Sequence, residues 1–101
     1  MGLKENVSRD KTDMLFSAIL ELKDIDEMYA FFEDLCTIPE VIELGDRFDI
    51  AIKLASGKTY TEVSSETGAS SATVSRVKKF LTFGAGGYRA AIGRLKDRSL
   101  L

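Results

Sequence analysis

The stretch "GKTYTEVSSETGASSATVSRVKKF", residues 57–80, decides the fold. Thr59 followed three residues later by Glu62 is a capping-box pattern, which starts a helix, and Ser70 can cap a second helix. Gly68 lies between them, where glycine adopts the left-handed conformation of a tight turn without a Cβ penalty. A short helix, a turn that contains glycine and a second helix make a helix-turn-helix.

The second helix of this motif has an apolar side and a small polar side. Val74 and Val77 face the first helix, where they would pack on Val63. The opposite side carries hydroxyl and methyl groups near the helix N-terminus and cations further on, a shape that fits a major groove about 12 Å wide. We therefore predict that the motif binds double-stranded DNA. The residues predicted to contact DNA are Ser70, Ser71, Ala72, Ser75, Arg76, Lys78 and Lys79.

The predicted contacts are of two kinds. Serine hydroxyls donate to or accept from several base edges, and a methyl group can touch the thymine methyl. Bases are therefore expected to be read by Ser71, Ala72 and Ser75. The helix N-terminus itself favours phosphate, and the phosphates beside the groove would be bound by three cations, Arg76, Lys78 and Lys79.

Charge is divided unevenly along the chain of 101 residues, whose net charge is −2. Residues 1–56 carry 13 acids and 6 bases, a net of −7, whereas residues 57–101 carry 3 acids and 8 bases, a net of +5. A polyanion responds to the local potential more than to the total charge. The basic half contains the helix-turn-helix, which supports the prediction of DNA binding.

The whole chain has the composition and periodicity of an all-α domain. Apolar residues make up 45% and charged residues 30%, which is typical of a folded domain. The 3.6-residue spacing of apolar side chains predicts six helices and no strand. The third helix, at about residues 38–56, has apolar residues on more than one side, which indicates burial from two directions. We expect a flexible N-terminal arm over residues 1–10 and a single helical domain over residues 11–101, with the helix-turn-helix at about residues 59–81.

The sequence does not predict secretion or a membrane span. It contains no run of about 18 apolar residues, and its first residues lack an apolar signal segment. Cys36 is the one cysteine, so no intrachain disulfide is expected. We therefore predict a cytoplasmic protein.

Two stretches resemble the tryptophan repressor family, and within it the YerC/YecD-type subgroup. They are "LCTIPEVIELGDRF", residues 35–48, and "GKTYTEVSSETGASSATVSRV", residues 57–77. The resemblance implies an all-helical, intertwined homodimer in which the first three helices of each copy wrap around those of the partner. It also implies that each copy presents its second helix-turn-helix helix to one DNA half-site, with half-sites about 34 Å apart.

That family binds tryptophan beside the recognition helix, with a threonine, two arginines and the space left by small residues. Val77 stands where the family has glycine and Phe80 where it has serine, and these side chains would fill the volume of an indole ring. We therefore predict no tryptophan binding, or only weak binding, and no cofactor. The residues that match the polar members of the pocket, and form its predicted remnant, are Thr37, Arg47, Thr73 and Arg76.

Two interpretations stay open for Phe80 and for the arginines. Phe80 either holds the reading helices in a DNA-competent pose as a wedge or fills the core, which is the commoner role. Arg47 and Arg76 either bind another anion or pair with acids such as Asp46 or Asp49, which is the commoner fate of a helix arginine.

Other chemistry has weak support in the sequence. There is no histidine, so a zinc site is not expected, and Glu43, Asp46 and Asp49 are interpreted as a solvated helix side rather than as metal ligands. "GAGG", residues 84–87, is interpreted as a joint before the last helix, because no strand precedes it as a phosphate loop requires. Cys36 is interpreted as a packing residue. No nucleophile is paired with a base, so we predict no enzyme.

The prediction is a transcription regulator of repressor type that binds DNA as a dimer and for which no small-molecule effector is expected. The alternative is a protein–protein interaction module, in which the helix-turn-helix is a scaffold and the acidic half is the contact surface. Salt titration separates the two, because DNA binding weakens steeply as salt is added.

Overall fold

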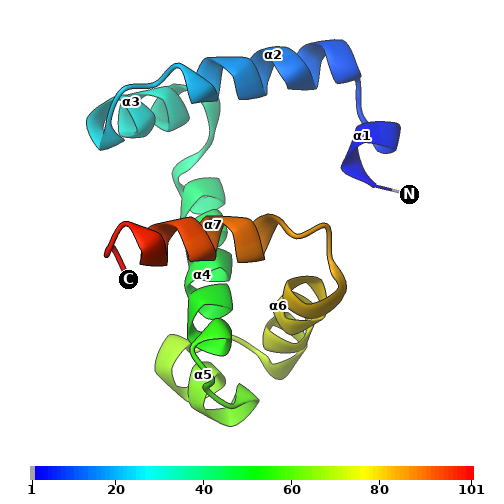
Figure 1. Cartoon of the computed structure of the whole chain (residues 1–101), viewed down its shortest axis with the longest axis vertical. Coiled ribbons are helices and arrows are strands. Elements are labelled where there is room, and N and C mark those ends of the chain that lie inside the picture. Colours follow the sequence, from blue (N-terminus) through cyan, green and yellow to red (C-terminus); the bar gives the residue numbers. More distant parts are fainter. Residues whose placement is uncertain (1) are drawn as a thin grey trace. The chain divides into compact units, whose positions relative to one another are not determined.

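The computed structural model describes residues 2–101, and these residues contain seven helices and no strand (Figure 1). The prediction of an all-α fold is confirmed, whereas the count of six helices is wrong. The additional helix has four residues and lies within the segment expected to be a flexible arm; the arm itself stays a prediction. The helices are α1 (Leu3–Asn6), α2 (Arg9–Leu20), α3 (Ile25–Leu35), α4 (Ile38–Ala55), α5 (Tyr60–Thr67), α6 (Ser71–Phe83) and α7 (Gly87–Asp97).

The chain divides after Val41 into two compact units, and each is described by itself. The first unit comprises α1, α2, α3 and the first turn of α4. The second unit comprises the rest of α4 together with α5, α6 and α7. The single domain predicted for residues 11–101 stays a prediction.

The first unit has well-capped helices but no buried side chain in α1, α2 or α3. Asp24 caps α3, because its Oδ1 accepts a hydrogen bond from the Glu27 N–H at 2.8 Å. Thr37 and Glu40 form a capping box at the start of α4, in which the Thr37 N–H donates to Glu40 Oε1 at 2.8 Å. These bonds fix the helix ends locally, but apolar side chains such as Leu20, which is 84% exposed, remain at the surface.

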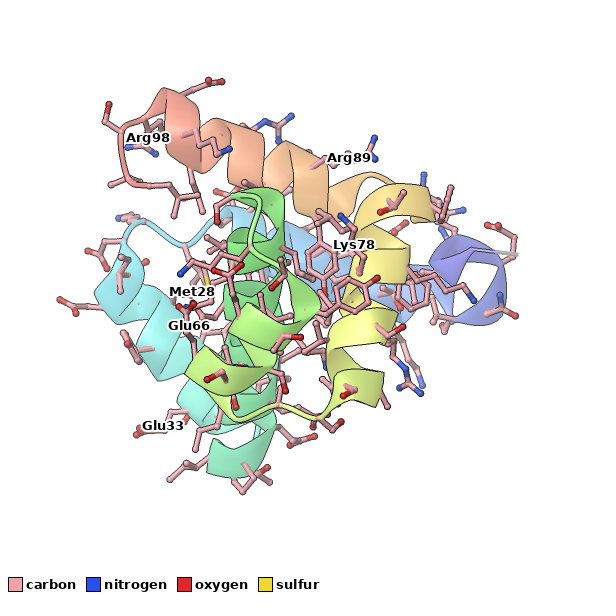
Figure 2. The ribbon with its side chains drawn as sticks, turned by 90° about the horizontal axis from the view of Figure 1, so that it is seen from below. Met28, Glu33, Glu66, Lys78, Arg89 and Arg98 are labelled. Carbon is pink, nitrogen blue, oxygen red and sulfur yellow. The ribbon has the colours of Figure 1, made fainter. Side chains whose placement is uncertain are left out.

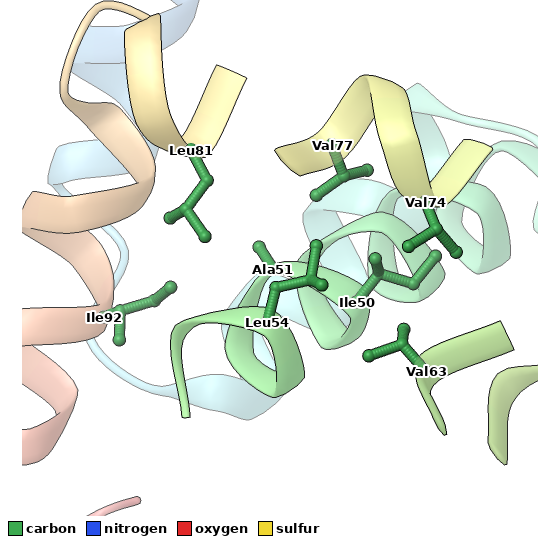
Figure 3. Packing of buried hydrophobic residues seen from close by; sticks show 8 residues of the cluster. All are labelled: Ile50, Ala51, Leu54, Val63, Val74, Val77, Leu81 and Ile92. Carbon is green, nitrogen blue, oxygen red and sulfur yellow. The ribbon is translucent and has the colours of Figure 1, made fainter. Parts of the chain in front are cut away.

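The core of the chain lies in the second unit, where α4 supplies one buried stripe and the three later helices pack on it (Figure 3). Other apolar side chains of α4 remain at the surface, since Ile42 is 57% and Leu44 48% exposed. This chain therefore fills only one of the two directions from which we expected α4 to be buried. The buried side chains are Ile50, Ala51, Leu54, Val63, Val74, Val77, Leu81 and Ile92.

The end of α6 is fixed by a glycine and an arginine. A Cβ on Gly84 would collide with the backbone carbonyl oxygen of Phe80, so the chain can leave the helix in this way only with glycine. Arg89 lies at the start of α7 (Figure 2), and it donates from Nε to the Leu81 carbonyl at 2.9 Å and from Nη2 to the Thr82 carbonyl at 3.1 Å. These are carbonyl groups that a helix end leaves free. Arg89 thus ties α7 to α6.

Candidate nucleic-acid interface

Short-range hydrogen bonds build the frame of the helix-turn-helix. Thr59 Oγ1 accepts the Glu62 N–H at 3.1 Å and the Glu62 carboxylate accepts the Thr59 N–H at 3.0 Å. The hydrogen bond from the Thr59 N–H lowers the pKa of Glu62, because it favours the charged carboxylate. Gly68 has a φ of 76°, and the Ser64 hydroxyl donates to the Ala69 carbonyl at 2.6 Å. The predicted capping box and the predicted left-handed turn are confirmed.

One buried stripe holds α6 against this frame. Val74 is 0% and Val77 2% exposed, and they belong to the same core cluster as Val63 of α5, which is 0% exposed. The prediction that these valines lock the two helices together is confirmed. At the start of α6, Ser70 Oγ accepts the Thr73 N–H at 3.2 Å and lies 3.0 Å from Thr73 Oγ1. Ser70 therefore fixes the helix end that would meet the DNA.

The side chains predicted to read bases lie on the open side of α6. Ser71, Ala72 and Ser75 are all exposed, while the stripe of Val74 and Val77 on the other side of the helix is buried. Small side chains on an exposed helix let its backbone approach a groove closely. The arrangement has the shape that the sequence predicted, and base reading by these residues stays a prediction.

Three cations follow on the same helix. Arg76 and Lys79 are exposed, and Lys78, labelled in Figure 2, is half-buried. Within residues 2–101, none of the three forms an ion pair with a carboxylate, whereas four other cations do: Arg9, Arg47, Lys53 and Lys58. A cation that has no carboxylate partner can bind a phosphate without first breaking an ion pair, and release of counterions favours that binding.

The second unit also has a polar pocket of about 490 Å³ beside the turn. Two residues of the predicted tryptophan-pocket remnant, Arg47 and Thr73, line it, whereas Arg76 does not line it and Thr37 belongs to the first unit. Only half of the predicted remnant is thus brought together within this unit. The pocket is also lined by four carboxylates, those of Glu43, Asp46, Asp49 and Glu66.

One of these carboxylates already binds Arg47. The Arg47 Nη2 donates to Glu43 Oε1 at 2.7 Å, and this hydrogen bond raises the pKa of the guanidinium. The interpretation that Arg47 pairs with an acid is confirmed, and the acid is Glu43 rather than Asp46 or Asp49, the two examples considered. Asp49 instead binds Lys53, with Nζ 2.7 Å from Oδ2. The four-residue spacing of Glu43 and Arg47 on one helix was the signal available in the sequence.

Phe80 lies outside the core of the unit. Its side chain is 53% exposed, whereas Val77, the other residue predicted to replace the tryptophan pocket, is 2% exposed. Within this chain the interpretation of Phe80 as core filler is therefore wrong. The interpretation as a wedge stays a prediction.

A second ion pair that the sequence did not indicate supports α5. Lys58 Nζ lies 2.7 Å from both carboxylate oxygens of Glu66, and the hydrogen bond to Glu66 raises the pKa of Lys58. The two residues are eight positions apart and only Glu66 lies in the helix, so no helical spacing predicts their contact. The pair connects the entrance of α5 with its last turn.

Other kinds of site have little support in the part of the chain that the structure describes. Among those residues, no group of three or more His, Cys, Asp and Glu side chains is placed to hold a metal ion. None of the described helices is long and apolar enough to cross a membrane. Cys36 is half-buried at the end of α3.

Comparisons with known proteins agree with this fold. The family model described as "Trp repressor protein" matches residues 10–96. The uncharacterized protein YerC of Bacillus subtilis (strain 168) is 49% identical over 85 residues, which cover 84% of this chain and 82% of YerC.

Two crystal structures are similar as well. A TrpR-like protein from Eubacterium eligens ATCC 27750 has a TM-score of 0.82 and 47% identity, covering 86% of this chain and 90% of that one. The structure "of a putative Trp repressor from Staphylococcus aureus" has a TM-score of 0.88 and 38% identity, covering 95% and 96% of the two chains. These matches confirm the all-helical, tryptophan-repressor-like fold that the sequence resemblance implied, whereas the intertwined dimer stays a prediction.

Proposed function

Because the chain belongs to the Trp repressor family, we propose that it is a transcription regulator that binds specific DNA sequences. It acts in the cytoplasm as a homodimer, and each copy places α6 in the major groove of one half-site. The matched family is one of repressors and not of enzymes, so the proposed activity is binding and involves no catalysis.

The observation that carries the proposal is the division of α6 into a locked side and an open side. The locked side is buried through Val74 and Val77, so the helix is rigid before it meets DNA and binding requires little ordering. The open side presents small hydroxyl groups that can hydrogen-bond several base edges and a methyl group that can touch a thymine methyl. Arg76 and Lys79, exposed and without a carboxylate partner among residues 2–101, supply contacts to phosphate.

Exposed apolar side chains support the dimer. In the first unit Ile25 and Tyr29 are each 73% exposed, and on α4 Ile42 is 57% exposed. Apolar surface on this scale marks an interface with another chain. A two-fold symmetric dimer would present two copies of α6, and a site composed of two half-sites about 34 Å apart would match it.

The regulator is proposed to act without tryptophan. Val77 stands where the family has glycine and is buried in the core, and Arg47, one of the two arginines of the predicted remnant, is already bound to Glu43. A ligand carboxylate would also be repelled by the carboxylates that line the polar pocket. Titration calorimetry should therefore detect no binding of tryptophan at neutral pH, and micromolar affinity would contradict this part of the proposal.

Selection of bound duplexes from a random pool tests the proposal as a whole. The expected result is a palindromic motif whose half-sites are about one helical turn apart, because the protein symmetry is copied in its site. Such a motif would establish sequence-specific binding, symmetry and spacing together. A pool that remains random after several rounds would refute sequence-specific recognition.

The rival proposal is a protein–protein interaction module that uses the first unit as its contact surface. Its support is the exposed apolar side chains of that unit together with ten acids against four bases in residues 1–41. A partner of this kind would bind independently of Lys78 and Lys79, whereas DNA binding requires them and weakens steeply with salt. Binding that survives neutralisation of these lysines would favour the rival.

A further inference from the structure

Two aromatic side chains of α6 remain outside the core of their unit. Phe80 is 53% exposed and Phe83 is 83% exposed, although Val77 and Leu81 of the same helix are buried. The two phenylalanines are three residues apart, so they are neighbours on the helix surface. We call Phe80 and Phe83 the aromatic pair. It follows the cations of α6 along the chain and leaves a large apolar surface in water.

The first unit has a pocket of complementary character. Its volume is about 430 Å³, within the range of sites that take an aromatic group. Ile25 and Tyr29 in its wall are each 73% exposed, which shows that this chain leaves the pocket open. We call it the apolar pocket, and its apolar lining residues are Leu22, Ile25, Met28, Tyr29, Phe32 and Val41.

The charges of the two units indicate which occupant the pocket would take. Residues 1–41 carry 10 acids and 4 bases, a net of −6, and residues 42–101 carry 6 acids and 10 bases, a net of +4. Two first units repel each other, whereas a first unit attracts a second unit. In a two-fold dimer this attraction occurs twice, because each copy supplies both surfaces. The charge pattern thus favours a second copy of this chain, aligned first unit to second unit.

We propose that the aromatic pair of one copy fills the apolar pocket of a second copy, and that the reciprocal contact forms at the same time. This inference rests on the proposed dimer and specifies the contact that joins it to the recognition helix. The pair and the reading residues belong to the same rigid α6, so docking of the pair fixes the pose in which that helix meets a half-site. Dimer formation then takes the place of a small-molecule effector in preparing the protein for DNA.

The dissociation constant of the dimer, measured by analytical ultracentrifugation, gives the first test. The variant Phe80→Ser/Phe83→Ser should dissociate at least about tenfold more readily, because burial of one phenylalanine alone changes an equilibrium constant by about ten- to a hundredfold. The matched control is Tyr60→Ser, which removes an aromatic ring of similar exposure, 46%, from α5. It should alter the constant by no more than about twofold. Equal effects of the two variants, or none, would overturn the proposal.

A double-mutant cycle tests whether the pair and the pocket touch. Tyr29→Ala opens the wall of the pocket. If the aromatic pair of the other copy contacts this wall, Tyr29→Ala should change the dimer dissociation constant less in the Phe80→Ser/Phe83→Ser background than in the wild type. Additive effects would overturn the proposal. The proposal would also be overturned if the two changes were coupled in the free energy of unfolding at concentrations too low for a dimer to form. The ring that fills the pocket would then belong to the same chain.

Duplex selection with the wild-type protein separates this inference from the proposed function. If a palindrome is enriched while the cycle is additive, the regulator stands and the aromatic contact is wrong. If no duplex is enriched, the proposed function fails, and the ultracentrifugation result still decides whether the aromatic pair holds two copies together.

Discussion

Replacement of Arg76, Lys78 and Lys79 by glutamine should flatten the salt dependence of DNA binding. None of the three is paired with a carboxylate in the described part of the chain, so each is free to neutralise one phosphate. In a dimer this makes about six contacts, and each contributes about 0.9 to the slope of log K against log salt, so the slope should fall in magnitude by about 5. Between about 50 and 200 mM salt, these six contacts account for a loss in affinity of about a thousandfold.

Fluorescence anisotropy of a labelled selected duplex, recorded over that salt range, measures the slope. The matched control neutralises Arg94 and Lys96 of α7 and Arg98, the residue after it. It removes the same charge as the α6 variant and likewise leaves every ion pair of residues 2–101 intact. The control should change the slope by less than about 1, because these cations lie outside α6. An unaltered slope in the α6 variant, or the same change in both variants, would refute phosphate binding by the cations of α6.

Three further predictions concern the frame of the motif. Gly84→Ala should lower the free energy of unfolding in urea by about 1–3 kcal/mol, because the new Cβ would collide with the Phe80 carbonyl. Gly93→Ala, whose Cβ would have nothing within 4 Å, should raise that free energy by about 0.5–1 kcal/mol. Changes of the same sign in the two variants would contradict this prediction. Ser70→Ala should cost about 1 kcal/mol in thermal unfolding through loss of the N-cap, and an unchanged melting temperature would argue against that role. The pKa of Glu62 is lowered in the folded state, so the stabilisation by its carboxylate is present above the usual value of 4.5 and is lost as the pH falls below it. Glu62→Gln should therefore weaken the dependence of the unfolding free energy on acidic pH. The same pH dependence in the variant and the wild type would exclude a contribution from Glu62.

The helix-turn-helix could be predicted from the sequence because local interactions determine it. A capping box joins two residues three positions apart, as at Thr59 and Glu62, and its hydrogen bonds depend little on the rest of the chain. The turn at Gly68 follows from the backbone freedom of one residue. Val63 and Val74 were predicted to pack because helical periodicity places them on facing sides, and both are 0% exposed.

The partners of ionic side chains could be predicted only in part. Arg47 was expected to bind an acid, and of the three acids within four positions of it on α4 only Glu43 stands at a spacing at which helix side chains meet. The contact of Lys58 with Glu66 needs the geometry of the loop before α5, which no residue spacing reveals. Such pairs depend on side-chain direction rather than on sequence distance.

The exposure of Phe80 was the clearest failure of sequence reasoning. A large aromatic ring is usually buried, so the core was its expected place. In the structure the buried stripe of α6 passes through Val77 and Leu81 and leaves Phe80 on the flank. Likewise, the apolar surplus on α4 predicted burial from two directions, and this chain fills one. A single sequence gives the pattern of apolar residues but not which chain will cover them.

The central claim is that the open side of α6 reads base pairs, and selection with an altered open side tests it most directly. The variant Ser71→Ala/Ala72→Gly/Ser75→Ala leaves the buried stripe and all three cations of α6 in place. The palindrome enriched by the wild type should lose its preferred bases at symmetric positions, at about 1–3 kcal/mol for each base pair no longer read, while salt-dependent affinity for any duplex remains. Enrichment of the same palindrome by the variant with undiminished preference would contradict base reading by the open side of α6.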